Sequence, residues 1–305
     1  MKMQNLRKKF AKVALDLAKK DPRVVIIVAD ISHGVFAEFR KKFPNRYFNI
    51  GICEPAIVSM AAGLSKVGFI PFVHTIAPFL IERSYEQIKL DFAYQKLNVN
   101  LVSTGSSFDY SQLGCSHHCY SDVSLIKKFR ESQIFLPSSE LELEGFIKRN
   151  YSKKKINYFR LTDNPHGIKL GKKQLSESCM SLSKGDKITV VAVANSLKNI
   201  MEVKDLIKNK NTLDIFYINS NKNIDFNKIN KSVRKTKKLL VVEELFYKGG
   251  IYEDILMNIE LKNVQKSEHI AIKDFVHGYG SYEEMKKKSN LNTDSILKKI
   301  KKILK

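Results

Sequence analysis

The sequence has few cysteines and no long hydrophobic run, and each absence excludes a class of protein. Its four cysteines, among 305 residues, follow none of the spacings of disulfide-rich secreted domains. No amino-terminal segment has the apolar core of a signal peptide. The longest stretch without a charged residue, Val67 to Ile81, contains two prolines and one histidine and is shorter than the roughly 20 apolar residues that span a bilayer. We therefore expect a soluble, cytoplasmic protein without a membrane partner.

The sequence also has few acidic residues relative to basic ones, so its formal net charge is +22. A strongly basic chain can attract nucleic acid, because lysine neutralises phosphates without contacting bases. Here the lysines are spread along the chain, with dense runs at residues 153–155, 286–288 and 298–305, and no zinc-knuckle, helix-turn-helix or RNA-binding motif accompanies them. We expect a solvated basic surface rather than a nucleic-acid partner, with an acidic partner as the second interpretation.

Apolar segments alternate with helical ones through the first half of the chain, which is typical of an α/β fold. Leu6 to Lys20 carries apolar residues at helical spacing, and Asp21-Pro22 follows as a stop signal. Val24 to Ala29 is a continuous apolar run of the kind that forms a parallel strand buried on both faces. Further strands are expected at Phe48–Ile50, Ile70–Val73, Val99–Ser103, Ser132–Leu136 and Asn157–Leu161.

A polar segment divides the chain into two expected domains, which suits a length of 305 residues. We assign residues 1–168 to a first α/β domain, residues 169–184 to a linker and residues 185–305 to a second α/β domain, with a parallel sheet in each. The carboxyl-terminal tail is basic and amphipathic, and we expect it to dock on its own domain rather than on a membrane. In the second domain, strands are expected at Ile188–Ala194, Thr212–Ile218 and Lys238–Val242, and helices at Ser196–Ile207 and Ile251–Ile259.

One carboxylate, Glu54, lies where the apolar strand around Phe48 meets an apolar helix. In a purely structural role it would be stabilised by the dipole at the start of that helix, with Pro55 in the first turn. Residues 47–64 also resemble the segment of the transketolase family that binds the aminopyrimidine ring of thiamine diphosphate, whose pattern is close to Phe-x-Asn-x-Gly-Ile-x-Glu followed by Ala-Ala-Gly-Leu. The resemblance implies that Glu54 is catalytic, since a carboxyl group on the pyrimidine ring favours the tautomer that activates the cofactor. It also places Ile52 among the cofactor contacts.

The resemblance extends, in order, over nearly the whole chain. Residues 83–88, 114–118, 242–244 and 277–281 are similar to successive segments of the family, and the Ser-His-His of residues 116–118 is similar to a loop of two-chain transketolases. The resemblance implies a pyrimidine-binding α/β domain followed by the carboxyl-terminal domain of the family.

Four more residues have roles implied by the resemblance. Phe79 stands where the family stacks an aromatic ring on the pyrimidine, and His117 stands where a histidine contacts the substrate hydroxyls and moves protons. Arg7 and Arg160 stand where a sugar phosphate is bound. Each has a structural alternative, namely a core aromatic, a loop histidine, or surface and salt-bridged arginines. Cys115 to Cys119 holds two thiols and two imidazoles, but four ligands within five residues rarely surround one ion, so no metal site is expected in this chain.

The chain lacks the Gly-Asp-Gly and downstream Asn that, in the family, hold magnesium and the diphosphate. Its single Gly-Asp pair, Gly185-Asp186, is followed by Lys187 and an apolar run. The resemblance therefore implies a partner chain, an amino-terminal transketolase subunit that carries this signature, and an α2β2 assembly with shared thiamine diphosphate and Mg2+ sites. The two chains would move a two-carbon ketol unit from a ketose, such as a sugar phosphate, to an aldose.

Four departures from the family pattern bear on the substrate: Pro55, Gly105, Leu113 and Leu245 replace residues that are usual in the family. Two alternatives therefore stay open. One is a subunit of a thiamine-dependent synthase that decarboxylates a 2-oxo acid, similar to deoxyxylulose-phosphate synthase or to the β subunit of 2-oxo acid dehydrogenases. The other is a non-catalytic scaffold subunit.

Overall fold

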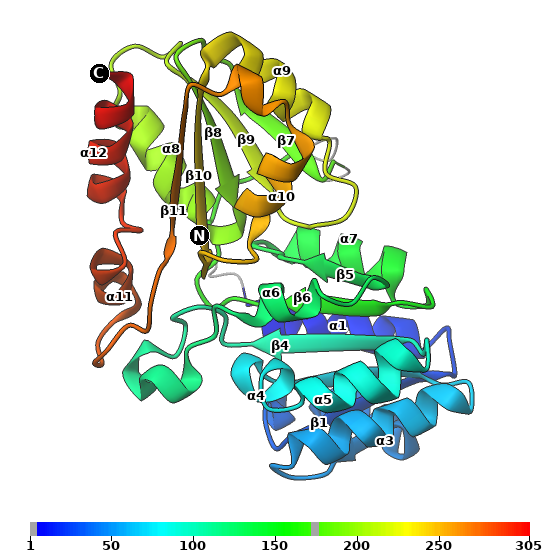
Figure 1. Cartoon of the computed structure of the whole chain (residues 1–305). Coiled ribbons are helices and arrows are strands. Elements are labelled where there is room, and N and C mark those ends of the chain that lie inside the picture. Colours follow the sequence, from blue (N-terminus) through cyan, green and yellow to red (C-terminus); the bar gives the residue numbers. More distant parts are fainter. Residues whose placement is uncertain (1–4, 172–176) are drawn as a thin grey trace. The chain divides into compact units, whose positions relative to one another are not determined.

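The computed structural model describes residues 5–171 and 177–305, and the chain forms two compact units (Figure 1). The first unit comprises the residues up to Asp109 together with Ser116–Pro165, and the second comprises Tyr110–Cys115 and His166–Lys305. Tyr110–Cys115 thus belongs to the second unit although the sequence places it within the first domain.

The first unit is built on a parallel sheet of six strands in the order β2-β1-β3-β4-β6-β5. The strand order reverses between β1 and β3, and ligands of such sheets bind beyond the carboxyl ends of the strands, next to the reversal. Every residue of β1, β4 and β6 is buried, as a parallel sheet covered on both faces requires. The strands are β1 (Val24–Val28), β2 (Tyr47–Asn49), β3 (Ile70–Ile76), β4 (Val99–Thr104), β5 (Ser132–Phe135) and β6 (Ile156–Arg160). The helices are α1 (Leu6–Ala18), α2 (Ala37–Lys42), α3 (Glu54–Lys66), α4 (Ala77–Ile81), α5 (Tyr85–Gln87), the π-helix η3 (Ile88–Tyr94), α6 (Asp122–Ile126) and α7 (Glu140–Asn150).

The second unit has a five-stranded sheet in the order β11-β10-β8-β9-β7. Its other pairs are parallel, but β7 runs antiparallel to β9, so the sheet is mixed rather than wholly parallel as expected. The strands are β7 (Cys179–Ser183), β8 (Ile188–Val193), β9 (Leu213–Ile218), β10 (Lys238–Phe246) and β11 (Lys266–Ile272). The helices are α8 (Leu197–Leu206), α9 (Phe226–Thr236), α10 (Ile251–Asn258), α11 (Tyr282–Lys288) and α12 (Thr293–Leu304).

Strand β7 lies inside the segment that the sequence assigns to a linker, residues 169–184. The polar composition of that segment conceals the strand, because only Cys179 and Met180 of β7 are buried and an edge strand needs no longer apolar run. Residues 172–176 of the expected linker lie outside the described residues.

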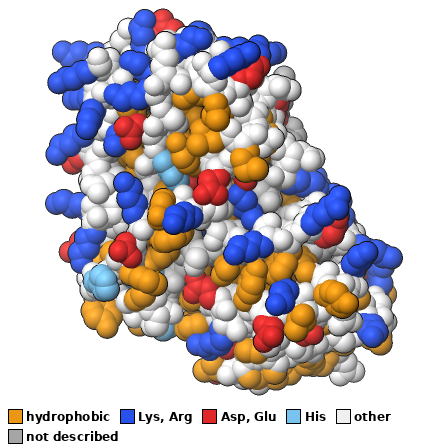
Figure 2. Space-filling model, viewed as in Figure 1, with side chains coloured by type: hydrophobic (Ala, Val, Ile, Leu, Met, Phe, Trp, Pro, Cys, Tyr) orange, Lys and Arg blue, Asp and Glu red, His pale blue; other side chains and the backbone are white. Residues whose placement is uncertain are grey.

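Lysine and arginine side chains are scattered over the face of the molecule drawn in Figure 2, with acidic side chains among them. The basic tail forms α12, whose residues Ile296, Ile300 and Ile303 are buried, so it docks on its own unit as the sequence predicts. Among the described residues, no helix is both long enough and apolar enough to cross a membrane.

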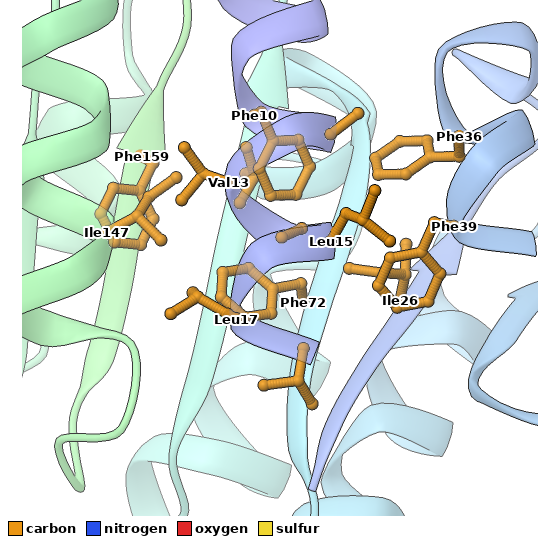
Figure 3. Close-up of a cluster of buried hydrophobic side chains, with 14 of the residues drawn as sticks. Phe10, Val13, Leu15, Leu17, Ile26, Phe36, Phe39, Phe72, Ile147 and Phe159 are labelled. Atoms are coloured by element: carbon orange, nitrogen blue, oxygen red, sulfur yellow. The ribbon is translucent and has the colours of Figure 1, made fainter. Parts of the chain in front are cut away.

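The core of the first unit forms where α1 crosses the sheet. Phe10, Val13, Leu15 and Leu17 project from α1 among the side chains around it, as Figure 3 shows. The ring of Phe10 meets that of Phe36 edge to face, with centroids 5.5 Å apart. This packing fixes the strands whose carboxyl ends carry the polar residues described next. Other buried members of the cluster are Ile26, Phe39, Phe72, Ile147 and Phe159.

Candidate active site

Glu54 is the first residue of α3 and follows the short loop after β2. Gly51 in that loop has a φ of 82°, a left-handed conformation that suits glycine. Pro55 lies in the first turn, where a missing backbone N–H costs nothing, and the helix dipole favours an acid at this end. The side chain of Glu54 is nevertheless only 2% exposed, so the fold encloses a carboxylate that a capping role alone would leave in solvent.

Arg83 joins Glu54 to Phe79. Its Nη1 atom donates a hydrogen bond of 2.8 Å to Oε2 of Glu54, and its guanidinium carbon lies 4.1 Å from the centroid of the Phe79 ring. Phe79 lies in α4, and Arg83 follows Phe79 by four residues, just beyond the end of that helix, so the two side chains lie on the same side. One cation therefore contacts both the acid and the aromatic ring that the sequence assigns to the cofactor.

His117 also contacts the ring of Phe79. The two rings meet edge to face with centroids 5.1 Å apart, and Nδ1 of His117 lies 3.0 Å from Oγ of Ser116. Its neighbour His118 is buried and meets the ring of Phe108 instead. The structure thus brings Glu54, Phe79 and His117 together through direct contacts along one chain of side chains.

Ile52 lies between β2 and α3, and its side chain is 73% exposed. A large apolar side chain in that position is free to contact a ligand or another chain. Unlike Glu54, Phe79 and His117, it makes no ring contact, hydrogen bond or ion pair within the described residues.

Arg160 lies in the protein interior. The resemblance to the family implies instead that this residue contacts a substrate phosphate. Its Nε donates a hydrogen bond of 2.7 Å to Asp122 and its Nη2 one of 2.8 Å to the carbonyl of Cys119. Tyr158 donates to the same Asp122 oxygen, at 2.5 Å. Burial alone would lower the pKa of Arg160, but the carboxylate of Asp122 holds that pKa above its usual value. Because the Nε and Nη2 atoms of this buried guanidinium already have partners within the chain, we do not include Arg160 among the proposed substrate contacts.

Arg7 is better placed for an anion. It projects from α1 and is 31% exposed, and its ion pair with Asp163 is long, 3.4 Å from Nη2 to Oδ2. An exposed pair of this kind contributes little to stability. Arg7 can therefore change partners at a small energetic cost.

Two further polar groups, the buried His74 and the partly buried Asp109, were not among the predicted site residues. His74 in β3 donates from Nδ1 to the carbonyl of Val102 and accepts from Ser32 at Nε2, and burial lowers its pKa to about 4, so it is neutral at pH 7. Burial raises the pKa of Asp109 to about 6, although Asn164 and Thr162 both donate hydrogen bonds to its carboxylate. Both make hydrogen bonds to residues distant in the chain, which no local sequence pattern predicts.

Arg83 was not among the predicted site residues, although it lies in residues 83–88, a segment similar to the family. One signal could have identified it, because a cation four residues after an aromatic on a helical segment is placed to cover that ring. Its pairing with Glu54 joins positions 29 residues apart, which no local pattern predicts.

The described residues fit one end of thiamine diphosphate. Glu54 offers an enclosed carboxylate for a ring nitrogen, and Phe79 offers a ring face for stacking. For the diphosphate end, no group of three or more His, Cys, Asp or Glu side chains within residues 5–171 and 177–305 is arranged to hold a metal ion. The fit is to the pyrimidine ring and does not extend to a magnesium diphosphate.

Two family models match the chain in succession. Residues 2–164 match the transketolase pyrimidine-binding domain, and residues 178–296 match the transketolase C-terminal domain. The first match alone covers more than half of the chain, and the expected family and the α/β fold are thereby confirmed.

Individual proteins resemble the chain in the same way. An apulose-4-phosphate transketolase subunit of Actinobacillus succinogenes is 32% identical over 251 residues, which are 78% of this chain and 78% of that protein. The 1-deoxy-D-xylulose-5-phosphate synthase of Clostridium perfringens is 29% identical over 300 residues, 96% of this chain, and the chain spans only 48% of that protein's length. A solved structure described as a split-gene transketolase, inactive β4 tetramer, superimposes with a TM-score of 0.85 at 25% identity and covers 98% of both chains. The chain belongs to the transketolase family and corresponds to its carboxyl-terminal section, with the pyrimidine-binding domain followed by the C-terminal domain.

Proposed function

We propose that this chain is the carboxyl-terminal subunit of a thiamine-diphosphate-dependent transketolase, which moves a two-carbon ketol unit from a ketose to an aldose. The observation that carries the proposal is the enclosed carboxylate of Glu54 beside the ring of Phe79. When bound, the cofactor supplies a nucleophilic carbon that accepts the ketol unit. The protein's task is to hold the pyrimidine ring so that this carbon becomes reactive.

Glu54 and Phe79 perform that task in the proposal. The Glu54 carboxyl group hydrogen-bonds the pyrimidine ring, and Phe79 supports its face. In the chain without cofactor, Arg83 makes both contacts itself, which keeps a buried carboxylate paired with a cation. Arg83 must release Glu54 and the Phe79 ring when the cofactor ring enters, so it is a positioning residue that competes with the cofactor.

A partner chain completes the site in this proposal. The described residues hold no metal-binding group, and the sequence lacks the Gly-Asp-Gly signature, so the partner supplies the Mg2+ and diphosphate contacts. We propose two copies of each chain, since closed assemblies pair identical surfaces. The similar split-gene protein is described as an inactive β4 tetramer, which supports the inference that such a chain is inactive without its partner.

Substrate contacts are proposed for His117 and Arg7. His117 lies against Phe79, next to the cofactor position, where an imidazole can exchange protons with substrate hydroxyls. Arg7 has a replaceable, partly exposed partner, and its planar guanidinium suits a phosphate. The similar protein from Actinobacillus succinogenes is named for a phosphorylated sugar, which supports a sugar phosphate as substrate.

A second candidate is a synthase that decarboxylates a 2-oxo acid before forming a carbon–carbon bond. The similarity to 1-deoxy-D-xylulose-5-phosphate synthase favours it, and Glu54 would serve that chemistry equally well. A scaffold role without turnover is the third.

One reconstitution experiment distinguishes the three functions. The chain is mixed with a Gly-Asp-Gly partner, thiamine diphosphate and Mg2+, and then supplied either with a ketose phosphate and an aldose or with a 2-oxo acid and an aldehyde. Ketol transfer without release of CO2 supports the transketolase. CO2 release coupled to carboligation supports the synthase, and no turnover of either pair supports the scaffold.

A further inference from the structure

A cavity of about 700 Å3 lies within the second unit, apart from the residues of the proposed active site. Three elements form it: β11 with the segment that follows it, the carboxyl end of α11, and one face of α12. These elements lie side by side in Figure 1. The volume is within the usual range for small-molecule sites, roughly 300–1,000 Å3.

The cavity wall contributed by α12 is basic. Ser295, Lys298, Lys299 and Lys302 line the cavity, and their spacing of three, four and seven residues puts them on one face of the helix. The adjoining apolar face of α12, with Ile296, Ile300 and Ile303, is buried in the unit. Lysine and arginine side chains gather along the edge of the molecule where α12 lies (Figure 2). This helix therefore directs a row of ammonium groups towards the cavity.

The opposite wall adds more positive charge and little negative charge. Lys273 and Lys288 line it together with His277, and Asp274 is the single carboxylate among the lining residues. Phe275 also lines the cavity, and its side chain is 63% exposed. Five lysines thus face one acid, and their field adds inside a concave surface.

Most of these lysines lack an internal counter-charge. Lys299 pairs with Glu268 at 3.0 Å. Within residues 5–171 and 177–305, however, no carboxylate lies within 4.0 Å of Nζ of Lys273, Lys298 or Lys302. The missing negative charge at the cavity has to come from a ligand or from solvent ions.

We propose that this cavity binds a small molecule that carries two or more phosphate groups. Ammonium groups on flexible side chains bind phosphate as point charges, and a ligand with several charges can satisfy lysines on both walls at once. The exposed ring of Phe275 offers an apolar contact for the organic part of such a ligand. This inference does not rest on the proposed function.

The test is a calorimetric titration of the full chain with inorganic pyrophosphate, without magnesium and at about 0.15 M ionic strength. Two double variants of equal charge are compared: Lys298→Glu with Lys302→Glu on the cavity face, and Lys301→Glu with Lys305→Glu, which have the same four-residue spacing but do not line the cavity. All four side chains are exposed, so both variants should unfold at the temperature of the parent chain.

We expect saturable binding of one pyrophosphate per chain, weakened about tenfold or more by the cavity pair and no more than about twofold by the control pair. Equal weakening by both pairs would mean diffuse surface charge and would overturn the proposal. Absence of saturable binding would overturn it too, and so would binding of single-stranded RNA in place of pyrophosphate. The titration needs neither thiamine diphosphate nor a partner, so its failure is distinct from a failure of ketol transfer.

Discussion

Nη1 of Arg83 lies 2.8 Å from Oε2 of Glu54. The Glu54 carboxylate is enclosed, whereas the Arg83 side chain is 45% exposed. The guanidinium of Arg83 also covers the ring of Phe79. A buried carboxylate needs a partner, because an unpaired charge in the interior is costly. The free chain therefore protects its central acid with a cation that has to move before a cofactor can bind.

Replacing that cation is the first prediction. Arg83→Met leaves the carboxylate of Glu54 without its charged donor, so we expect the free energy of unfolding of the free chain to fall by about 2 kcal/mol. In the complex with the partner, thiamine diphosphate no longer competes with Arg83, so we expect its dissociation constant to fall about threefold to tenfold. Urea unfolding and calorimetry measure the two effects.

Lys89→Met is the matched control, since it removes an exposed cation six residues further along the chain. It should change neither quantity. Weaker cofactor binding by Arg83→Met would contradict competition and would make Arg83 a direct cofactor contact.

The second prediction concerns Arg160 and Asp122. Arg160→Met leaves the fully enclosed carboxylate of Asp122 unpaired, so we expect a loss of about 3–5 kcal/mol of folding free energy. The double variant Arg160→Met with Asp122→Leu removes both charges and should recover most of the loss. If Arg160→Met instead leaves the stability intact and raises KM for a phosphorylated ketose, Arg160 is a phosphate ligand after all.

The third prediction follows from the neutral state of His74. Burial lowers the pKa of its imidazole to about 4 from an ordinary value of 6.5, so the unfolded chain binds the extra proton first as the pH falls. The stability that neutral His74 allows is present above pH 6.5 and is lost as the pH falls towards 4. Between pH 7 and pH 5 we expect the parent chain to lose about 2 kcal/mol more than His74→Gln does.

Urea unfolding at the two pH values measures that difference. The exposed His277 provides the control, because His277→Gln should behave as the parent chain does. An equal loss of stability in the parent chain and in His74→Gln would show that His74 titrates alike in both states.

The fourth prediction assigns the substrate phosphate to Arg7. Arg7→Gln removes a charge-assisted contact, so we expect KM for a phosphorylated ketose to rise about tenfold or more with little change in kcat. An unphosphorylated ketose should be unaffected. Lys8→Gln, next to it on α1 and exposed, is the control. A fall in kcat with KM unchanged would argue against a role for Arg7 in ground-state binding.

Much of the fold follows from local patterns in the sequence. The run of Val24 to Ala29 becomes β1, and the spacing of apolar residues in Leu6 to Lys20 becomes α1, with ends that differ by one or two residues. Strand β1 is buried along its whole length and α1 along one face, and both patterns are visible in the sequence itself. Strands β7 and β11 were missed because they are short or half-polar edge strands.

The site was predictable only in part. Glu54, Phe79 and His117 lie in motifs, and the structure joins them through side-chain contacts. Arg160 shows the limit, because its partners Asp122 and Cys119 come from about 40 residues away and only the folded sheet brings them beside it. A motif specifies the residue type at a position, whereas its environment depends on residues that the motif does not contain.

In the proposed function, Glu54 activates a thiamine cofactor in a site that this chain shares with a second chain. The most direct measurement is calorimetric binding of thiamine diphosphate and Mg2+ to the chain alone, to the chain with a Gly-Asp-Gly partner, and to that mixture carrying Glu54→Gln, together with turnover of a ketose donor. We expect tight binding only with the partner, and a loss of turnover of about 100-fold or more in Glu54→Gln. Normal turnover by Glu54→Gln, or no cofactor binding by the mixture, would contradict the account.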